Sequence, residues 1–277
     1  MDGMAFDPVA IAGDGEGRRP SDRTVAVRAG SEPASLVRTV NPPIQRGSTV
    51  LAPAAAALYD PGQVTYGRAG LQPHGALSDA LTELEQGLGT RLFPSGLAAI
   101  TGALLALLSS GDDLLVADCV YRRTRRFCDD VLRRLGITAR YFDPCLAPEA
   151  VLGLARDNTR AIILESPGSL TFDLQDIPAI AALARVQGIA VIADNTWGAG
   201  LLCKPLELGA DFSIQALTKY VGGHSDGFMG SVTARTPEGL RQLDHAIAQF
   251  GWSVGADDAY QMLRGLRTLP TRLAAHG

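Results

Sequence analysis

From about Arg91 onwards, short apolar runs rich in β-branched residues alternate with longer amphipathic stretches. This alternation is typical of repeated βα units built around a mostly parallel sheet. The predicted strands are Asp113–Ala117, Ala139–Phe142, Ala161–Glu165, Ala190–Asp194, Phe212–Gln215 and Gly230–Ala234. The predicted helices are Gly96–Leu108, Thr124–Leu135, Pro148–Ala155, Ile177–Val186, Pro237–Gln249 and Ala256–Leu266.

The character of these strands predicts the layering. Ala161-Ile-Ile-Leu164 is apolar without alternation, as expected for a strand that is buried on both faces. We therefore predict an α/β fold with three layers, α/β/α, and a mostly parallel sheet. Residues 1–22 are rich in Gly, Asp and Arg and lack the segments of a secretion signal. We predict a disordered leader there, an N-terminal arm over residues 23–64 and the α/β domain over residues 65–277.

Composition argues against several classes of partner. The net charge is −4, and the arginines of Tyr121–Arg126 are followed at once by Asp129 and Asp130, so we expect no nucleic-acid partner. The apolar run Leu97–Leu108 is interrupted by Gly102 and is shorter than the roughly 20 residues of a membrane span. The four cysteines form no C-x-x-C pair and have no histidine cluster beside them. We expect no metal site, reduced thiols and a cytoplasmic protein without membrane contact.

Polar residues that could take part in chemistry follow three of the predicted strands. They lie in Glu165–Ser169, Asp194–Trp197 and Thr218-Lys219. Ligands of open α/β sheets bind beyond the carboxyl ends of the strands. We therefore expect these three segments to converge on one crevice.

Lys219 is the first candidate for chemistry, since it follows an apolar strand and precedes the glycine-rich turn Val221-Gly-Gly-His224. A lysine there would be partly shielded from water, which prepares an amine for covalent catalysis. The alternative is a lysine whose stem lies along the strand end while its ammonium group reaches solvent.

Two further candidates could bind the charged groups of a ligand. Asp194 closes the strand Ala190–Asp194, where it could serve a cofactor, cap the next helix or bind a metal. Phe93-Pro-Ser-Gly-Leu97 opens an apolar helix, so Gly96 and Leu97 can direct free N–H groups at a phosphate, to which Thr218 could add its hydroxyl. The alternative for this second segment is an ordinary helix N-cap at Ser95.

Taken together, the motifs resemble a known family. In order and spacing, Asp194–Gly200, Ser213–Tyr220 and Gly223–Asp226 resemble the cofactor-lysine region of the Cys/Met-metabolism family of fold-type I pyridoxal phosphate enzymes. Thr65–Arg68, Phe93–Gly96 and Glu165–Ser169 also match, and the resemblance runs from about Thr24 to the end of the chain. Within the family, Gln-Ala-Leu-Thr-Lys and Glu-Ser-Pro-Gly-Ser resemble the variants of bacterial cystathionine β-lyases.

The resemblance implies pyridoxal 5′-phosphate as cofactor, the large domain of the fold-type I fold, and roles for individual residues. Lys219 would be the Schiff-base lysine and proton carrier, Asp194 the carboxylate opposite the pyridine nitrogen, and Tyr121 a ring that stacks on the cofactor and assists proton transfer. Tyr66 and Arg68 would reach the phosphate of a neighbouring subunit, which implies a homo-oligomer, a dimer or a tetramer. The other implied cofactor contacts are Ser95, Gly96, Leu97, Ser169, Thr196 and Thr218.

The implied activity is a carbon–sulfur lyase that acts on a sulfur amino acid and splits cystathionine into homocysteine, pyruvate and ammonia, as in transsulfuration and methionine biosynthesis. A γ-synthase or γ-lyase of the same family remains an alternative, because Ala-Gly-Leu after Arg68 and Arg-Arg-Thr after Tyr121 depart from the family pattern. The family's smaller C-terminal domain, with the arginine for the substrate carboxylate, has no counterpart before Gly277. A second alternative is therefore a cofactor-binding chain with little activity. A nicotinamide dehydrogenase is disfavoured, since no G-x-G-x-x-G follows a strand.

Overall fold

The computed structural model describes residues 20–30, 39–60 and 63–276. A seven-stranded sheet lies at its centre, in the order β1-β7-β6-β5-β4-β2-β3. β2 to β6 run parallel to their neighbours among these strands, whereas β7 pairs antiparallel with both β6 and β1. The strands are β1 Gly89–Phe93, β2 Asp113–Ala117, β3 Thr138–Phe142, β4 Thr159–Glu165, β5 Ala190–Asp194, β6 Phe212–Gln215 and β7 Gly230–Ala234.

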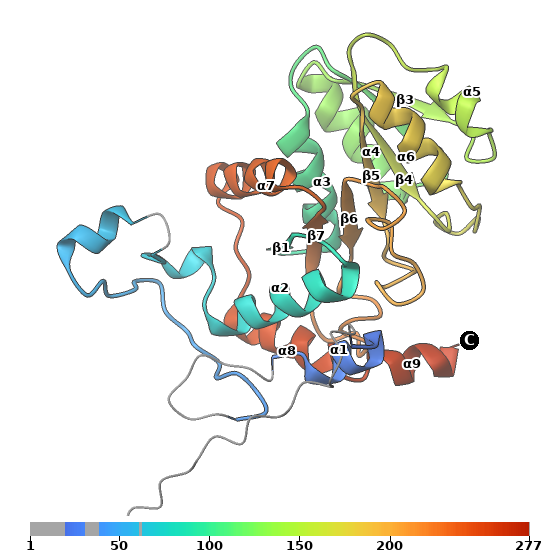
Figure 1. Cartoon of the computed structure of the whole chain (residues 1–277). Helices are drawn as coiled ribbons and strands as arrows, with labels where there is room; N and C mark the ends of the chain where they lie inside the picture. Colours follow the sequence, from blue (N-terminus) through green and yellow to red (C-terminus); the bar gives the residue numbers. More distant parts are fainter. Residues whose placement is uncertain (1–19, 31–38, 61–62, 277) are drawn as a thin grey trace, which may run out of the picture.

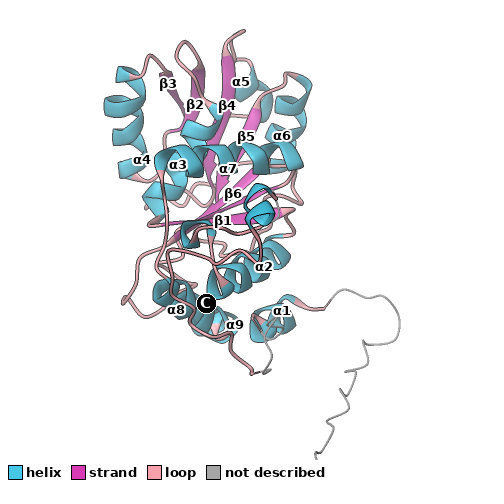
Figure 2. Ribbon diagram, turned by 90° about the vertical axis from the view of Figure 1, so that its left-hand side faces the viewer, coloured by secondary structure: helices cyan, strands magenta, loops and turns pink. Residues whose placement is uncertain are grey.

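Helices cover both faces of the sheet, so that the fold is the expected three-layer α/β/α arrangement (Figures 1 and 2). α3, α4 and α7 lie on one face, and α5 and α6 lie on the other. The helices are α1 Asp22–Arg28, α2 Gln72–Glu85, α3 Gly96–Leu107, α4 Arg122–Phe127, α5 Pro148–Leu152, α6 Ile177–Val186, α7 Pro237–Phe250, α8 Ala256–Leu266 and α9 Leu269–His276. Short helical turns occupy Ala55–Tyr59, Gly67–Ala69 and Cys128–Leu132, the last of which continues α4.

Two apolar clusters stabilise the described part of the chain. The first surrounds the sheet and includes Val116, Ile162 and Ile192, none of which is more than 1% exposed. Burial of these strand side chains on both faces confirms the interpretation of the apolar runs. The second cluster joins α1, α2, α8 and α9 through residues such as Leu81 and Leu263 (Figure 2). It holds the helices that lie beside the carboxyl end of β6.

All six predicted strands and all six predicted helices are confirmed, with ends that differ by a few residues. β1 was not predicted, because it begins with a glycine and carries Arg91, whose charge is paired with Asp244 of α7. α2 and α9 were also missed, since each has a proline in its first turn, which punctuates the apolar pattern although it is compatible with a helix start. α1 was missed because its two buried residues, Val25 and Ala26, give little periodicity.

The domain boundaries stay a prediction. The leader falls almost wholly on residues 1–19, which lie outside the described ranges. Within the expected arm, α1 packs on α2, and Val25 is 4% exposed. Further along, Leu51 and Tyr59 are 89% and 88% exposed, in a segment that projects away from the sheet (Figure 1).

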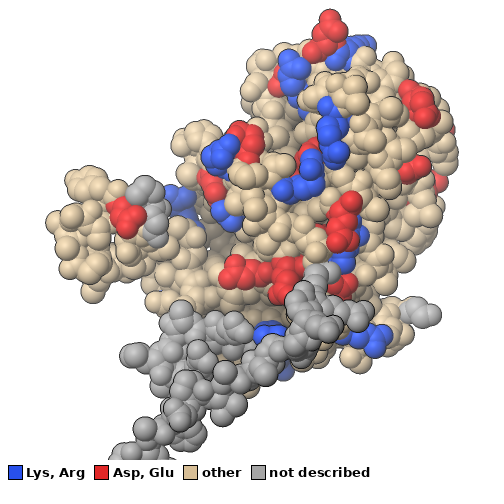
Figure 3. All heavy atoms as spheres, in the orientation of Figure 1, with Lys and Arg blue, Asp and Glu red and all other residues tan. Residues whose placement is uncertain are grey.

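The surface carries charges of both signs. The face shown in Figure 3 carries both basic and acidic side chains, with acidic side chains gathered in a row over α2. Among the described residues, none of the helices is long and apolar enough to cross a bilayer.

Candidate active site

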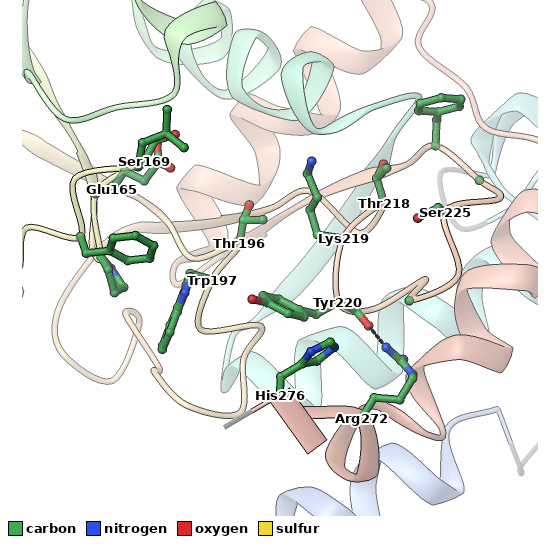
Figure 4. A pocket seen from close by; sticks show the side chains of 17 residues that line it. Glu165, Ser169, Thr196, Trp197, Thr218, Lys219, Tyr220, Ser225, Arg272 and His276 are labelled. Atoms are coloured by element: carbon green, nitrogen blue, oxygen red, sulfur yellow. Dashed lines mark hydrogen bonds between the residues drawn. The ribbon is translucent and has the colours of Figure 1, made fainter. Parts of the chain in front are cut away.

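A cavity of about 610 Å³ lies at the carboxyl ends of β4, β5 and β6 (Figure 4). The three segments that the sequence analysis expected to converge all line it. Four of the predicted site residues contribute to it, namely Ser169, Thr196, Thr218 and Lys219. The remaining lining residues are Glu165, Pro167, Gly168, Leu170, Phe172, Trp197, Tyr220, Gly223, Ser225, Gly227, Phe228, Arg272 and His276.

Lys219 lies in the turn that follows β6. Its N–H donates to Ala216 O at 3.0 Å, and its own carbonyl accepts from the Gly223 N–H at 2.8 Å. In Figure 4 the side chain extends between Thr196 and Thr218, away from Arg272. The lysine is exposed to the open cavity, so the expected shielding by the strand is wrong: Lys219 stands four residues beyond the end of β6.

Thr196 connects the lysine-bearing segment to Asp194. Its hydroxyl donates to Asp194 Oδ1 at 2.6 Å and accepts from the Ala216 N–H at 2.9 Å, while its N–H donates to the same Oδ1 at 3.0 Å. Asp194 is 7% exposed, and its Oδ2 accepts no hydrogen bond from the residues that the structure describes. One carboxylate oxygen is therefore held by the protein and the other is available.

A second acid lies beside Asp194. Glu165 and Asp194 are register partners at the ends of β4 and β5, and Glu165 Oε2 accepts the Tyr121 N–H at 2.6 Å. Burial raises the pKa of both carboxyl groups, and the negative charge of Asp194 raises the pKa of Glu165 further. Neither acid has an ion pair among the described residues, so the pair would gain from a ligand that brings positive charge.

The start of α3 abuts the lysine-bearing segment. Ser95 is its N-cap, with Oγ accepting the Ala98 N–H at 3.0 Å, as the plainer interpretation held. The N–H groups of Gly96 and Leu97 have no acceptor within the described chain and remain available to an anion. A Cβ on Gly96 would lie 2.4 Å from the Ala216 Cβ, so only glycine permits this approach. None of these three residues lines the cavity itself.

Of four further predicted residues, Thr218 lines the cavity, whereas Tyr121, Tyr66 and Arg68 do not. Tyr121 is the N-cap of α4, is 45% exposed and does not line the cavity. The Thr218 hydroxyl accepts the Met229 N–H at 3.0 Å and lies 3.2 Å from Met229 O. Tyr66 and Arg68 line a separate cavity of about 450 Å³ beside α8. In this single chain they are not brought to Lys219.

The sequence analysis missed Arg272 and His276, which α9 brings to the cavity. The Arg272 guanidinium donates to Tyr220 O and, through Nη2, to Val221 O at 3.0 Å and Gly265 O at 2.7 Å. Partial burial lowers the pKa of Arg272. Because two of its partners are carbonyls of the turn that carries Lys219 and the third belongs to α8, Arg272 ties that turn to α8. No sequence signal identified it, since the prediction placed no helix after Leu266.

Fold and site define the class: an α/β domain with a lysine amine in a cavity and buried acids at the strand ends. A family model for Cys/Met metabolism PLP-dependent enzymes matches residues 23–277. The chain belongs to this family of pyridoxal phosphate enzymes, and the resemblance seen in the sequence is confirmed.

Individual relatives agree with this assignment. The chain is 44% identical over 248 residues to a putative cystathionine beta-lyase of Rhizobium johnstonii, covering 89% of this chain and 62% of that protein. It is 40% identical over 263 residues to the cystathionine beta-lyase MetC of Escherichia coli, covering 91% of this chain and 66% of MetC. Cystathionine gamma synthase from Xanthomonas oryzae pv. oryzae superposes with a TM-score of 0.86 at 30% identity, over 92% of this chain and 65% of the synthase. The chain thus spans roughly two thirds of these relatives.

The residues present fit pyridoxal phosphate. The cofactor's aldehyde needs an amine, its ring nitrogen a carboxylate and its phosphate a set of N–H donors. The site offers the Lys219 amine in the cavity, the free Oδ2 of buried Asp194, and the unpartnered N–H groups at the start of α3. The roles of the individual residues remain proposals.

Proposed function

We propose that this chain holds pyridoxal phosphate on Lys219 and catalyses β-elimination of cystathionine to homocysteine, pyruvate and ammonia. The observation that carries the proposal is the placement of Lys219 in a cavity beside Thr196, which links the lysine-bearing segment to buried Asp194. The relatives named as cystathionine beta-lyases, at 40–44% identity, support this substrate.

When bound, pyridoxal phosphate supplies an electron sink that stabilises negative charge at the substrate's α-carbon. Asp194, fixed by Thr196, keeps a negative charge where the ring nitrogen must hold its proton. The amine of Lys219 would remove the proton from the substrate α-carbon, and homocysteine would leave the β-carbon as a thiolate. Water would then hydrolyse the released enamine to pyruvate and ammonia. Tyr121 would stack on the ring, and Ser95, Gly96, Leu97, Ser169, Thr196 and Thr218 would complete the cofactor contacts.

Product analysis tests the reaction. Purified chain with pyridoxal phosphate and cystathionine is expected to release pyruvate, whereas Lys219→Ala releases none. Release of 2-oxobutyrate instead would assign the chain to γ-elimination, a neighbouring activity given the 35% identity over 256 residues to a cystathionine gamma-lyase of Bacillus subtilis. If neither keto acid forms although cofactor is bound, the lyase proposal is wrong for this chain.

We further propose a cytoplasmic homo-oligomer in which Tyr66 and Arg68 reach the phosphate of a neighbouring subunit. The cytoplasmic location is supported by the four cysteines, all of which are free. The shared site is supported by Tyr66, which is 51% exposed in a cavity apart from Lys219. Light scattering measures the assembly, and cell fractionation the location. If the chain binds pyridoxal phosphate as tightly at high dilution, where it is a monomer, as it does at high concentration as an oligomer, the shared site is contradicted.

A further inference from the structure

A buried carboxylate lies behind the site and is unused by the proposed chemistry. Glu85 is the last residue of α2 and is 1% exposed. Its Oε2 accepts the Ser213 hydroxyl at 3.0 Å, its Oε1 accepts the Gln215 amide, and the Asn195 Nδ2 lies 3.4 Å from both oxygens. These three partners are themselves no more than 2% exposed.

The partners of Glu85 are all donors. An ionised carboxylate accepts only, so it can satisfy a hydroxyl and two amides at once. Burial raises the pKa of Glu85, while these hydrogen bonds and the nearby Lys204 ammonium counteract it. Lys204 is bonded to Leu84 O and, at 2.8 Å, to Gly200 O. Burial of a charged carboxylate costs free energy unless all of its hydrogen bonds are made. We therefore expect Glu85 to have a specific role.

The positions of the partners indicate that task. Asn195 directly follows Asp194 at the end of β5, and Gln215 directly precedes Ala216 at the end of β6. On the cavity side, the Ala216 N–H is bonded to Thr196, which is bonded to Asp194. The ends of β5 and β6 are therefore joined on one side by Thr196 and on the other by Glu85.

We propose that Glu85 is a positioning residue that fixes the separation between Asp194 and the Lys219 turn. The inference rests on the proposed function, in which those two residues hold opposite ends of the cofactor ring. Glu85 does not line the cavity. It acts through Asn195 and Gln215, whose side chains it orients.

Glu85→Gln tests this role, because the amide keeps the shape but presents an N–H₂ group to partners that are donors. The dissociation constant of pyridoxal phosphate is measured by visible absorbance, and the visible circular dichroism per bound cofactor reports its orientation. We expect the dissociation constant to rise about tenfold, as for the loss of a hydrogen bond to a charged group, and the dichroic band to change at full loading.

The matched control is Leu81→Ala, one turn earlier on the same helix. Leu81 is fully buried, so this variant lowers the melting temperature without removing a partner of Glu85. If Leu81→Ala and Glu85→Gln have the same dichroic band as the wild type at full loading, Glu85 is structural only and the inference is overturned. Should Glu85→Gln fail to fold, Ser213→Ala removes one donor alone, and an unchanged band and affinity there would equally overturn it.

The two proposals fail differently. If the wild type shows no visible band and borohydride fixes no cofactor on Lys219, the proposed function is wrong and the inference falls with it. If the wild type shows both and Glu85→Gln matches it, only the inference is wrong.

Discussion

Gly96→Ala should damage both the fold and the cofactor site. A Cβ at position 96 would lie 2.4 Å from the Ala216 Cβ and 3.0 Å from the Ala216 Cα. Ordinary contact begins at 3.4 Å, so the start of α3 and the Ala216 segment must separate by about 1 Å. Overpacking of this kind costs about 1–3 kcal/mol of the free energy of unfolding. Urea denaturation measures that loss.

The same shift moves the N–H groups of Gly96 and Leu97 away from the turn that carries Lys219. We expect pyridoxal phosphate to bind at least tenfold more weakly, since misplacement by about 1 Å can cost roughly 100-fold in a reaction that depends on alignment. Absorbance titration measures the affinity. Ala216→Gly added to Gly96→Ala removes the closer contact and should restore part of both losses.

Gly75→Ala is the matched control, because Gly75 lies in α2 and a Cβ there meets nothing within 4 Å. It should stabilise the protein by about 0.5–1 kcal/mol and leave cofactor affinity unchanged. If Gly96→Ala behaves like Gly75→Ala in both assays, the close approach of α3 to the lysine-bearing segment is not as described.

Three shorter predictions follow from other sites. Asp194→Asn should still bind pyridoxal phosphate but lose most exchange of the substrate α-proton, measured by NMR in D₂O; undiminished exchange would remove Asp194 from the mechanism. Arg68→Ala should weaken cofactor binding by the oligomer, and an affinity equal to that of the wild type would contradict the cross-subunit role. Burial alone would raise the pKa of Asp113, but its hydrogen bonds with Arg140 at 2.6 Å hold that pKa below its ordinary value. Asp113 therefore stabilises the fold above about pH 4 and less as pH falls below it. Asp113→Asn should cost about 3 kcal/mol of the free energy of unfolding at neutral pH, and the urea midpoint of this variant should depend less on pH at acid pH. A dependence of the urea midpoint on pH that is unchanged from the wild type would refute the pairing.

The sequence predicted most of the sheet because its central strands are buried on both faces. Val116, Ile162 and Ile192 each sit in an unbroken apolar run, a pattern that few other structures produce. The same reasoning placed Lys219 and Thr196 at one edge, since parallel strands end together. β1 was not predicted because its residue Arg91 is charged. In the fold Arg91 pairs with Asp244 of α7, 153 positions away, and no local sequence pattern predicts that contact.

The supporting residues of the site were less accessible to sequence reasoning. Glu85 looks like an ordinary acid at the end of an amphipathic helix until the fold places Ser213 and Gln215 against it. Arg272 lies two residues after Pro270. Its role becomes visible only from its hydrogen bonds to the carbonyls of Tyr220 and Val221, which lie 52 and 51 positions away in the sequence. Both roles depend on long-range contacts, whereas Lys219 is flanked by motifs of its own.

The most direct test of the central claim is the location of the cofactor. Purified chain is incubated with pyridoxal phosphate, reduced with borohydride, digested and analysed by mass spectrometry, with Lys219→Ala and Lys204→Ala treated in parallel. The account predicts one phosphopyridoxyl adduct on Lys219, present in Lys204→Ala and absent in Lys219→Ala. The chain has only two lysines, so an adduct on Lys204 at a yield comparable to that on Lys219, or a wild-type adduct yield in Lys219→Ala, would contradict it.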